Sequence, residues 1–438
     1  MHLKIWSSKF LILSTIITAV LICSQIARAE TAVDLYNKGL GMHRSGKYEE
    51  ALEYFDKAIV ADPELAQAWN NRGGTLAGLG RYQEAIESYE KAIEFDPKLA
   101  IAWLNKGGAL SMLGRNKEAV ECYDMALQLE PKLADAWFGK ARALQNLGRY
   151  EEAIKAYDTA LELDPTFISA WGSKGAMLTE LGRYDEAIEC YDKYLVLDPD
   201  NYTTWYNKGQ ALNLSGRYRK AAECYTKVLE IDPNISQAWA SKGTALAMLE
   251  QYQEAINCLN RAVELNPNDV DAWYNKGTVL DILGRYQEAV EAYDKALEID
   301  PQSELAWSTK AKTLGKLDRY QEAIDCYDKV LEIGVPLSDE WFNQSMALLK
   351  SENNEEALVY VAKALEMDTK NARAWSNKGL LLAKMGKQKE ALVCYDNALN
   401  IDTGHVPDWS EDDVPLSETP EYAEAEAKAI GTTGGQGQ

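Results

Sequence analysis

The sequence predicts an all-α solenoid, in which helix pairs stack one on the next along the chain. Three observations predict it: an unbroken 34-residue spacing of tryptophans, two helical runs in each interval, and a proline that closes most intervals. A fixed period of this length indicates repeats that bury their apolar faces against neighbouring repeats. The tryptophans with this spacing are Trp69, Trp103, Trp137, Trp171, Trp205, Trp239, Trp273, Trp307, Trp341, Trp375 and Trp409.

Each interval contains the spacing of two helix faces. In one of them Trp171, Gly175 and Leu178 lie four and three residues apart, which places them on one face of a helix. A Gly-Arg-Tyr turn follows, then a second run with the same spacing, and then a proline that stops it. When each repeat is numbered from three residues before its Trp, eleven repeats run from 32–65 to 372–405.

Small residues recur where the two helices of a repeat must meet. Position 8 is Gly in eight repeats and Ala or Ser in the others, and position 20 is Ala in all eleven. Gly in a helix interior costs about 1 kcal/mol relative to Ala, so its repeated use needs a packing reason. We expect the helices to approach closely at these positions, with Trp at position 4 and the usual Tyr at position 24 filling the space beside the contact.

The order Trp, small residue, Leu, Gly, Ala, Tyr, Ala and Pro over 34 residues resembles the tetratricopeptide repeat family, across residues 32–405. The resemblance implies antiparallel helix pairs stacked into a right-handed superhelix, with a concave side lined mainly by the first helices. The family usually has Leu at position 7, whereas this chain has Lys in nine repeats. A Lys stem can cover apolar surface while its ammonium group stays in water, so we expect the packing to survive.

Repeat 338–371 departs furthest from the pattern. It has Ser345 at position 8, Glu352 in place of the turn glycine and Thr369 in place of the closing proline. We expect the weakest or most bent junction of the array near residues 334–356.

The two ends of the chain differ from the array at 30–405. Residues 1–29 have the features of a secretory signal peptide: a basic start, an apolar run over 10–23, and a small-residue cleavage site at 27–29. They predict export to a secreted, periplasmic or cell-surface location, with an uncleaved leader as a membrane tether as the alternative. At the other end, residues 406–438 read as a C-terminal cap and an acidic, Gly-rich tail, in which Trp409 is expected to cover the open face of the last repeat.

Charge and cysteine usage exclude several classes of function. Without the three basic residues of the leader, 43 Lys and Arg stand against 68 Asp and Glu, a net charge of −25 that argues against nucleic-acid partners. The six cysteines of the array occupy one repeat position, so neighbours lie about 10 Å apart, beyond disulfide reach. We expect free thiols that pack as small hydrophobic residues. These are Cys122, Cys190, Cys224, Cys258, Cys326 and Cys394.

Nothing in the sequence indicates catalysis. The array has two histidines, no Cys-x-x-Cys pair and no glycine-rich phosphate loop, so we expect no enzyme activity, no cofactor and no metal site. The prediction is a non-catalytic protein- or peptide-binding scaffold. Two alternatives remain: a structural surface protein that self-associates, and an accessory subunit that positions a catalytic partner. The oligomeric state is left open.

The family resemblance implies that positions 2, 5, 9, 12 and 13 of each repeat line the concave groove. Large aromatic residues there could accept apolar side chains of a peptide, or could simply help neighbouring helices to pack. Basic residues gather in repeats nine to eleven, which suggests binding of an acidic segment, either of a partner or of the chain's own tail at 411–426. The candidate binding residues are Phe138, Arg142, Tyr206, Tyr274, Lys312, Lys316, Phe342, Lys350, Arg373 and Lys384.

Overall fold

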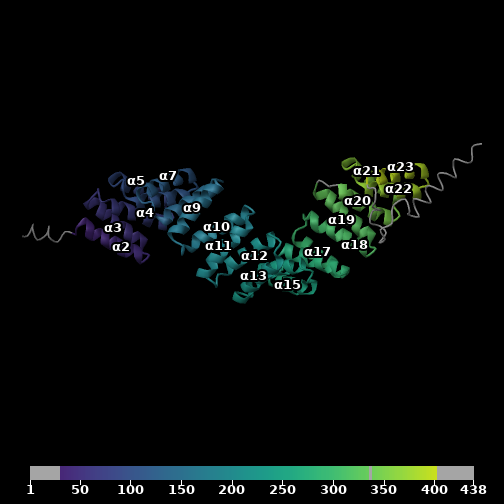
Figure 1. Ribbon diagram of the computed structural model, residues 1–438, viewed down its shortest axis with the longest axis horizontal. Coiled ribbons are helices and arrows are strands. Elements are labelled where there is room, and N and C mark those ends of the chain that lie inside the picture. Colours follow the sequence, from purple (N-terminus) through teal and green to yellow (C-terminus); the bar gives the residue numbers. More distant parts are fainter. Residues whose placement is uncertain (1–29, 335–337, 402–438) are drawn as a thin grey trace, which may run out of the picture. The chain divides into compact units, whose positions relative to one another are not determined.

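The computed structural model describes residues 30–334 and 338–401. This part of the chain consists of 22 α-helices, α2 to α23, in eleven consecutive pairs and without a strand, which confirms the predicted all-α repeat architecture (Figure 1). The first helices of the pairs are α2 (Ala32–Arg44), α4 (Ala66–Gly78), α6 (Ala100–Met112), α8 (Ala134–Asn146), α10 (Ile168–Glu180), α12 (Tyr202–Leu214), α14 (Ser236–Ala247), α16 (Val270–Ile282), α18 (Glu304–Lys316), α20 (Ser338–Lys350) and α22 (Ala372–Lys384). The second helices are α3 (Tyr48–Ala61), α5 (Tyr82–Phe95), α7 (Asn116–Leu129), α9 (Tyr150–Leu163), α11 (Tyr184–Leu197), α13 (Tyr218–Ile231), α15 (Tyr252–Leu265), α17 (Tyr286–Ile299), α19 (Tyr320–Ile333), α21 (Asn354–Met367) and α23 (Gln388–Ile401).

Two expectations concern segments outside the described residues: a signal peptide at 1–29, and a C-terminal cap and tail at 406–438 that contains Trp409. Both remain predictions. None of the described helices combines the length and the apolar character that crossing a membrane requires.

The contacts between helices divide the chain into two compact units, with the boundary between Thr204 and Trp205. The first unit holds the pairs from α2–α3 to α10–α11, and the second holds the pairs from α14–α15 to α22–α23 together with α13 and most of α12.

Each first helix ends at a turn that needs a left-handed backbone. The residue at position 15 has a positive φ in all eleven repeats, and in eight of them it is Gly, for example Gly80 with φ of +76°. Glycine adopts this conformation without the steric cost that a Cβ atom brings. Glu250, Asp318 and Glu352 take the same conformation with φ of 61°, 58° and 65°, so three turns carry strain that the others avoid.

In most repeats the small residue at position 8 faces an aromatic ring at position 24 of the same repeat. A Cβ atom added to Gly107 would lie 2.9 Å from Cε1 of Tyr123, and one added to Gly73 would lie 2.5 Å from Cε1 of Tyr89. The alanines at position 20 are all at most 1% exposed. The close approach of the two helices is therefore confirmed, and the aromatic ring itself lies on the glycine.

In most repeats the tryptophan at position 4 binds to the end of the preceding repeat. Trp137 donates its Nε1–H to the carbonyl oxygen of Pro131 at 3.0 Å, and Trp171 does the same to Pro165 at 3.0 Å. In the divergent repeat Thr369 replaces the proline, yet its carbonyl accepts the same bond from Trp375 at 2.9 Å. The bond needs only the backbone oxygen, which explains why this repeat keeps its place in the stack without the proline.

The lysine at position 7 also connects neighbouring repeats. Lys140 lies 5.2 Å from the ring centroid of Trp137, and its Nζ is 2.6 Å from Oδ1 of Asp124 at position 25 of the preceding repeat. Lys106, Lys174 and Lys310 make equivalent ion pairs. The predicted survival of the packing is confirmed, because the lysine stem is largely buried and its charge is paired.

The divergent repeat still forms a helix pair, α20 and α21. Ser345 donates its hydroxyl to the carbonyl oxygen of Phe342 at 2.7 Å and accepts a bond from Nδ2 of Asn377 at 2.8 Å. The junction before it includes residues 335–337, which lie outside the described part of the chain. The expected weakness near 334–356 remains a prediction.

Candidate functional site

The side chains at position 13, at the end of each first helix, form an exposed row. Position 13 is exposed in all eleven repeats, from Arg44 to Lys384. Within each unit neighbouring first helices contact one another, for example α4 with α6 and α6 with α8 in the first unit, and α14 with α16 and α16 with α18 in the second. Side chains at this position therefore follow one another from repeat to repeat on a continuous face of each unit.

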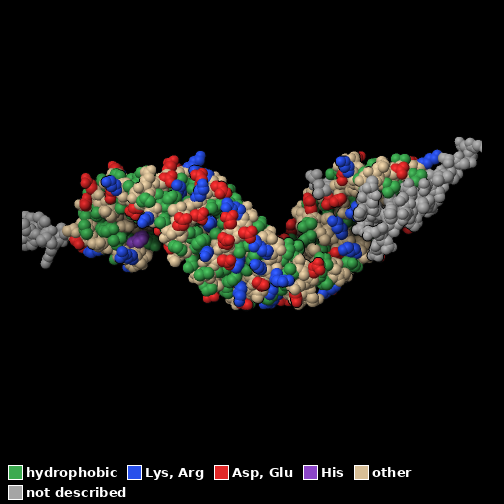
Figure 2. Space-filling view, in the orientation of Figure 1, with side chains coloured by type: hydrophobic (Ala, Val, Ile, Leu, Met, Phe, Trp, Pro, Cys, Tyr) green, Lys and Arg blue, Asp and Glu red, His purple; other side chains and the backbone are tan. Residues whose placement is uncertain are grey.

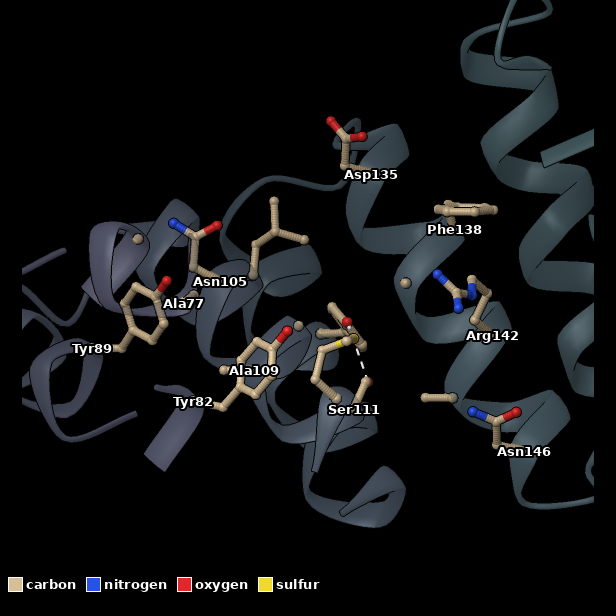
Figure 3. Close-up of a pocket in the computed structure, with 17 residues that line it drawn as sticks. Ala77, Tyr82, Tyr89, Asn105, Ala109, Ser111, Asp135, Phe138, Arg142 and Asn146 are labelled. Atoms are coloured by element: carbon tan, nitrogen blue, oxygen red, sulfur yellow. Dashed lines mark hydrogen bonds between the residues drawn. The ribbon is translucent and has the colours of Figure 1, made fainter. Parts of the chain in front are cut away.

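A pocket of about 510 Å³ opens on this face in the first unit, between α4, α6 and α8 (Figure 3). Two of its lining residues, Gly74 and Gly108, leave space because they have no side chain, whereas at Gly139 the Tyr123 ring fills that place. A Cβ atom at Gly108 would have no neighbour within 4 Å, so this glycine borders open space. A pocket of this volume has room for a side chain of a bound segment.

Predicted site residues on α8 line one side of this pocket. Figure 3 shows Asp135, Phe138 and Arg142 along α8, with Tyr82 and Asn105 across the pocket. The Arg142 side chain is exposed, and its guanidinium carbon lies 5.8 Å from the centroid of the Phe138 ring. The structure thus brings Phe138 and Arg142 together, as an aromatic surface beside a cation that a ligand can reach.

The aromatic residues at position 5 pack against neighbouring helices, which is one of the two roles that the sequence left open for them. Phe138, Tyr206 and Tyr274 are half-buried. The Tyr206 ring centroid lies 5.6 Å from that of Tyr225, and its hydroxyl is 3.3 Å from Oγ of Ser241 in the next repeat. Tyr274 lies 5.8 Å from Tyr293 and reaches Thr309 of the next repeat at 3.3 Å.

Phe342 is a correction to the expectation of an exposed ring. Its side chain is 3% exposed and belongs to the core formed by α17 to α22. Arg373 of the next repeat lies over it, with the guanidinium carbon 5.0 Å from the ring centroid. Phe342 therefore offers no free surface to a ligand, and it supports Arg373 instead.

The predicted basic residues of repeats nine to eleven divide into two kinds. Lys312, Lys350, Arg373 and Lys384 are exposed, and none forms an ion pair with another residue in the described ranges. Lys316 differs, because its Nζ lies 2.5 Å from Oδ2 of Asp281 and 5.2 Å from the Tyr286 ring centroid. Its charge is already compensated by the preceding repeat.

Position 13 also contains residues that the sequence hypothesis missed. In repeats six, seven and eight it is Leu214, Met248 and Ile282, which are 60%, 56% and 54% exposed. In repeats nine to eleven the same position is lysine. Reading position 13 for hydrophobicity as well as charge would have found this change from apolar to basic along the second unit. We call these three residues the apolar row.

Sequence profiles of the tetratricopeptide repeat match most of the chain. The matched segments are 43–100, 100–133, 134–167, 168–201, 202–235, 240–304, 282–336, 341–371 and 372–403. No curated protein matches the sequence.

Several solved structures are similar to the chain. The C-terminal part of a TPR repeat-containing protein from Cytophaga hutchinsonii is 20% identical, with a TM-score of 0.49, over 54% of this chain and 97% of that one. MamA is 30% identical with a TM-score of 0.36, over 38% of this chain and 90% of MamA. YrrB, described as a TPR protein with an unusual peptide-binding site, is 26% identical with a TM-score of 0.38, over 43% of this chain and 97% of YrrB. With eleven helix pairs in register and profile matches from residue 43 to residue 403, the chain belongs to the tetratricopeptide repeat family.

Proposed function

We propose that the chain is an exported, non-catalytic scaffold that binds an extended segment of another protein along the face formed by its first helices. The apolar row carries this proposal. Three large hydrophobic side chains, each more than half exposed, recur at one position of consecutive repeats. Grouped exposed apolar side chains of this kind mark binding surfaces, whereas scattered ones are ordinary.

The surroundings of the apolar row favour a protein ligand. Acidic side chains are spread over the visible surface of the chain, which opposes binding of nucleic acid (Figure 2). The row lies on the rigid first helices, so little conformational entropy is lost when a partner docks. Apolar side chains spaced by one repeat suit an elongated segment that contacts several repeats in turn.

Partner capture from a native extract tests the proposal. The chain would be compared with a row variant, Leu214→Gln, Met248→Gln and Ile282→Gln, which removes the apolar surface without touching the core. A matched control variant, Val196→Gln, Val359→Gln and Val393→Gln, removes apolar side chains of the second helices that are 80%, 54% and 59% exposed.

We expect the control variant to capture the same partner as the parent chain and the row variant to lose it. Equal capture by all three would contradict the assignment of binding to this face. Particles whose mass grows with concentration, without a partner, would instead favour self-association.

Export is part of the proposal and rests on the leader at 1–29. The intact mass of the protein from its native source shows whether the leader has been cleaved. A chain that starts at Glu30 supports cleavage, and a chain that retains residues 1–29 supports the membrane-tethered alternative.

A further inference from the structure

The second unit presents a group of exposed basic side chains that form no ion pair with its described residues. Lys312 on α18, Lys350 on α20, and Arg373 and Lys384 on α22 are exposed and form no ion pair within 30–334 and 338–401. We call these four residues the basic row. By contrast, Lys310, Arg319 and Lys329 of the same unit each pair with an acid.

One position nearby shows that this face accepts carboxylates. Asp281 on α16 pairs with Lys316 and also accepts the hydroxyl of Thr313 at 2.9 Å. The acid lies one repeat before the lysine that it compensates, so the pair crosses between neighbouring first helices. Lys350 and Lys384 occupy position 13 of the next two repeats, and neither has an equivalent acid. Position 12 of the preceding repeat is Gly315 for Lys350 and Leu349 for Lys384.

The chain itself supplies the missing charge. Residues 411–426 contain seven acidic residues and no basic one. They begin ten residues after the end of α23, which packs against α22, the helix that carries Arg373 and Lys384. We propose that this acidic segment docks on the basic row of its own chain; the inference rests on the proposed function only in using the same face.

The reach of the segment is sufficient. Glu411 lies ten residues after Ile401, and an extended chain spans roughly 3.3 Å per residue, or about 33 Å over these ten steps. Packed helices lie about 8–10 Å apart, so three neighbouring first helices cover about 20 Å. All four basic residues therefore lie within range of the segment.

The covalent tether favours binding of the chain's own acidic segment to the basic row over binding of a free acidic ligand. A single exposed ion pair contributes only about 0.2–1 kcal/mol, which is too little to hold a free peptide. A covalent tether gives an effective concentration in the millimolar range, so several such pairs suffice. An acidic partner would have to displace the segment, whereas the apolar row stays open to other ligands.

A distance measurement in the full chain tests this inference. The cysteines of the array are buried, so a cysteine introduced on the surface can be labelled selectively once Cys23 of the leader is replaced by Ser. Ser351→Cys, next to Lys350, and Ser410→Cys, next to Glu411, would carry nitroxide labels for pulsed electron paramagnetic resonance. We expect a narrow distance distribution, centred below about 30 Å if the segment lies on the basic row.

Charge reversal identifies the contacts. We expect a basic-row variant, Lys312→Glu, Lys350→Glu and Lys384→Glu, to broaden the distribution of distances between the two labels. A segment variant, Glu411→Lys, Asp412→Lys and Asp413→Lys, should broaden it as well, and the two sets combined should narrow it again. A control variant with the same charge change on second helices, Lys295→Glu, Lys329→Glu and Lys389→Glu, should leave it narrow.

Three results would overturn the inference. One is a broad distribution in the parent chain, and another is a narrow one that charge reversal does not alter. The third is a short distance that is found only when two singly labelled chains are mixed. This result would show that the basic row binds the acidic segment of a second copy of the chain. None of these results depends on partner capture, so the inference can fail while the proposed function holds, and the reverse.

Discussion

Lys140 joins two repeats, because its Nζ lies 2.6 Å from Oδ1 of Asp124 while its ammonium group lies over the Trp137 ring. In the family this position is usually Leu, which packs but carries no charge. The lysine keeps the packing through its stem and adds an ion pair to the preceding repeat. The same arrangement at Lys106, Lys174 and Lys310 makes the pair a recurring link of the array.

The first prediction concerns this link. Lys140→Ala removes an ion pair of about 0.2–1 kcal/mol and a cation–π contact of about 0.5–1 kcal/mol, so we expect a loss of about 1–2 kcal/mol in the free energy of unfolding. Lys242→Ala should cost less, because Thr226 occupies the place of the acid. Urea unfolding of both variants, and a double-mutant cycle with Asp124→Ala, measures the difference. Equal losses at Lys140 and Lys242 would show that the ion pair contributes nothing.

The second prediction sets two adjacent glycines of α6 against each other. Gly108→Ala gains helix propensity in open space, so we expect it to stabilise the chain by about 1 kcal/mol. Gly107→Ala gains the same helix propensity but places a methyl group 2.9 Å from the buried Tyr123 ring, and overpacking of this kind costs about 1–3 kcal/mol, so we expect a net loss of stability. Thermal unfolding of the two variants should therefore shift in opposite directions. A shift in the same direction would contradict the assignment of Gly107 to the helix contact and Gly108 to the pocket wall.

The sequence was sufficient to predict the helix pairs because their determinants are local and repeated. Register, the turn at position 15 and the small residue at position 8 recur within each 34-residue unit, so every first helix begins at position 1 and every second helix at position 17. The six thiols also are free and buried, as the spacing predicts.

The candidate site was harder to predict, because exposure depends on the neighbouring repeat. Phe342 and Tyr206 share a repeat position, yet Phe342 is in the core and Tyr206 is half-buried. Lys316 lies in the basic group by sequence but is paired with Asp281, an acid 35 residues earlier. The apolar row was overlooked because position 13 was compared for charge alone.

The third prediction concerns the strained turns. Glu250 and Glu352 adopt positive φ angles of 61° and 65°, a conformation that costs a residue with a Cβ atom roughly 1–2 kcal/mol relative to its preferred one. We expect Glu250→Gly and Glu352→Gly each to stabilise the chain by about 1 kcal/mol, since part of the gain is offset by the greater backbone entropy of glycine. Gly284→Ala, at the same position of another repeat, is the reverse control and should destabilise. The urea midpoints of unfolding of these variants and the parent chain test the prediction. If Glu352→Gly destabilises the chain, the Glu352 side chain contributes more to stability than its positive φ angle costs.

The fourth prediction concerns the thiols. Burial raises the pKa of Cys122, Cys190 and Cys326 from 9.0 to about 11. At pH 8 these thiols stay protonated and shielded, so we expect slow reaction with a disulfide reagent in the native chain and rapid reaction in urea. The number of thiols that react in urea also reports on the leader: six in a chain that has lost Cys23, and seven in one that keeps it.

The same pKa shifts fix the sign of the pH dependence. The unfolded thiols lose protons from about pH 9, whereas the folded ones hold them to about pH 11, so the stability that they contribute is complete below pH 9 and falls as the pH rises to 11. Buried tyrosines reinforce the loss at higher pH, since burial raises the pKa of Tyr157 from 10.0 to about 12. Between pH 9 and 10 the thiols should therefore dominate. We expect a variant with Cys122→Ala, Cys190→Ala and Cys326→Ala to lose stability less steeply in this interval than the parent chain, in urea unfolding at each pH. Parallel slopes for the two proteins would contradict the assignment of this interval to the buried thiols.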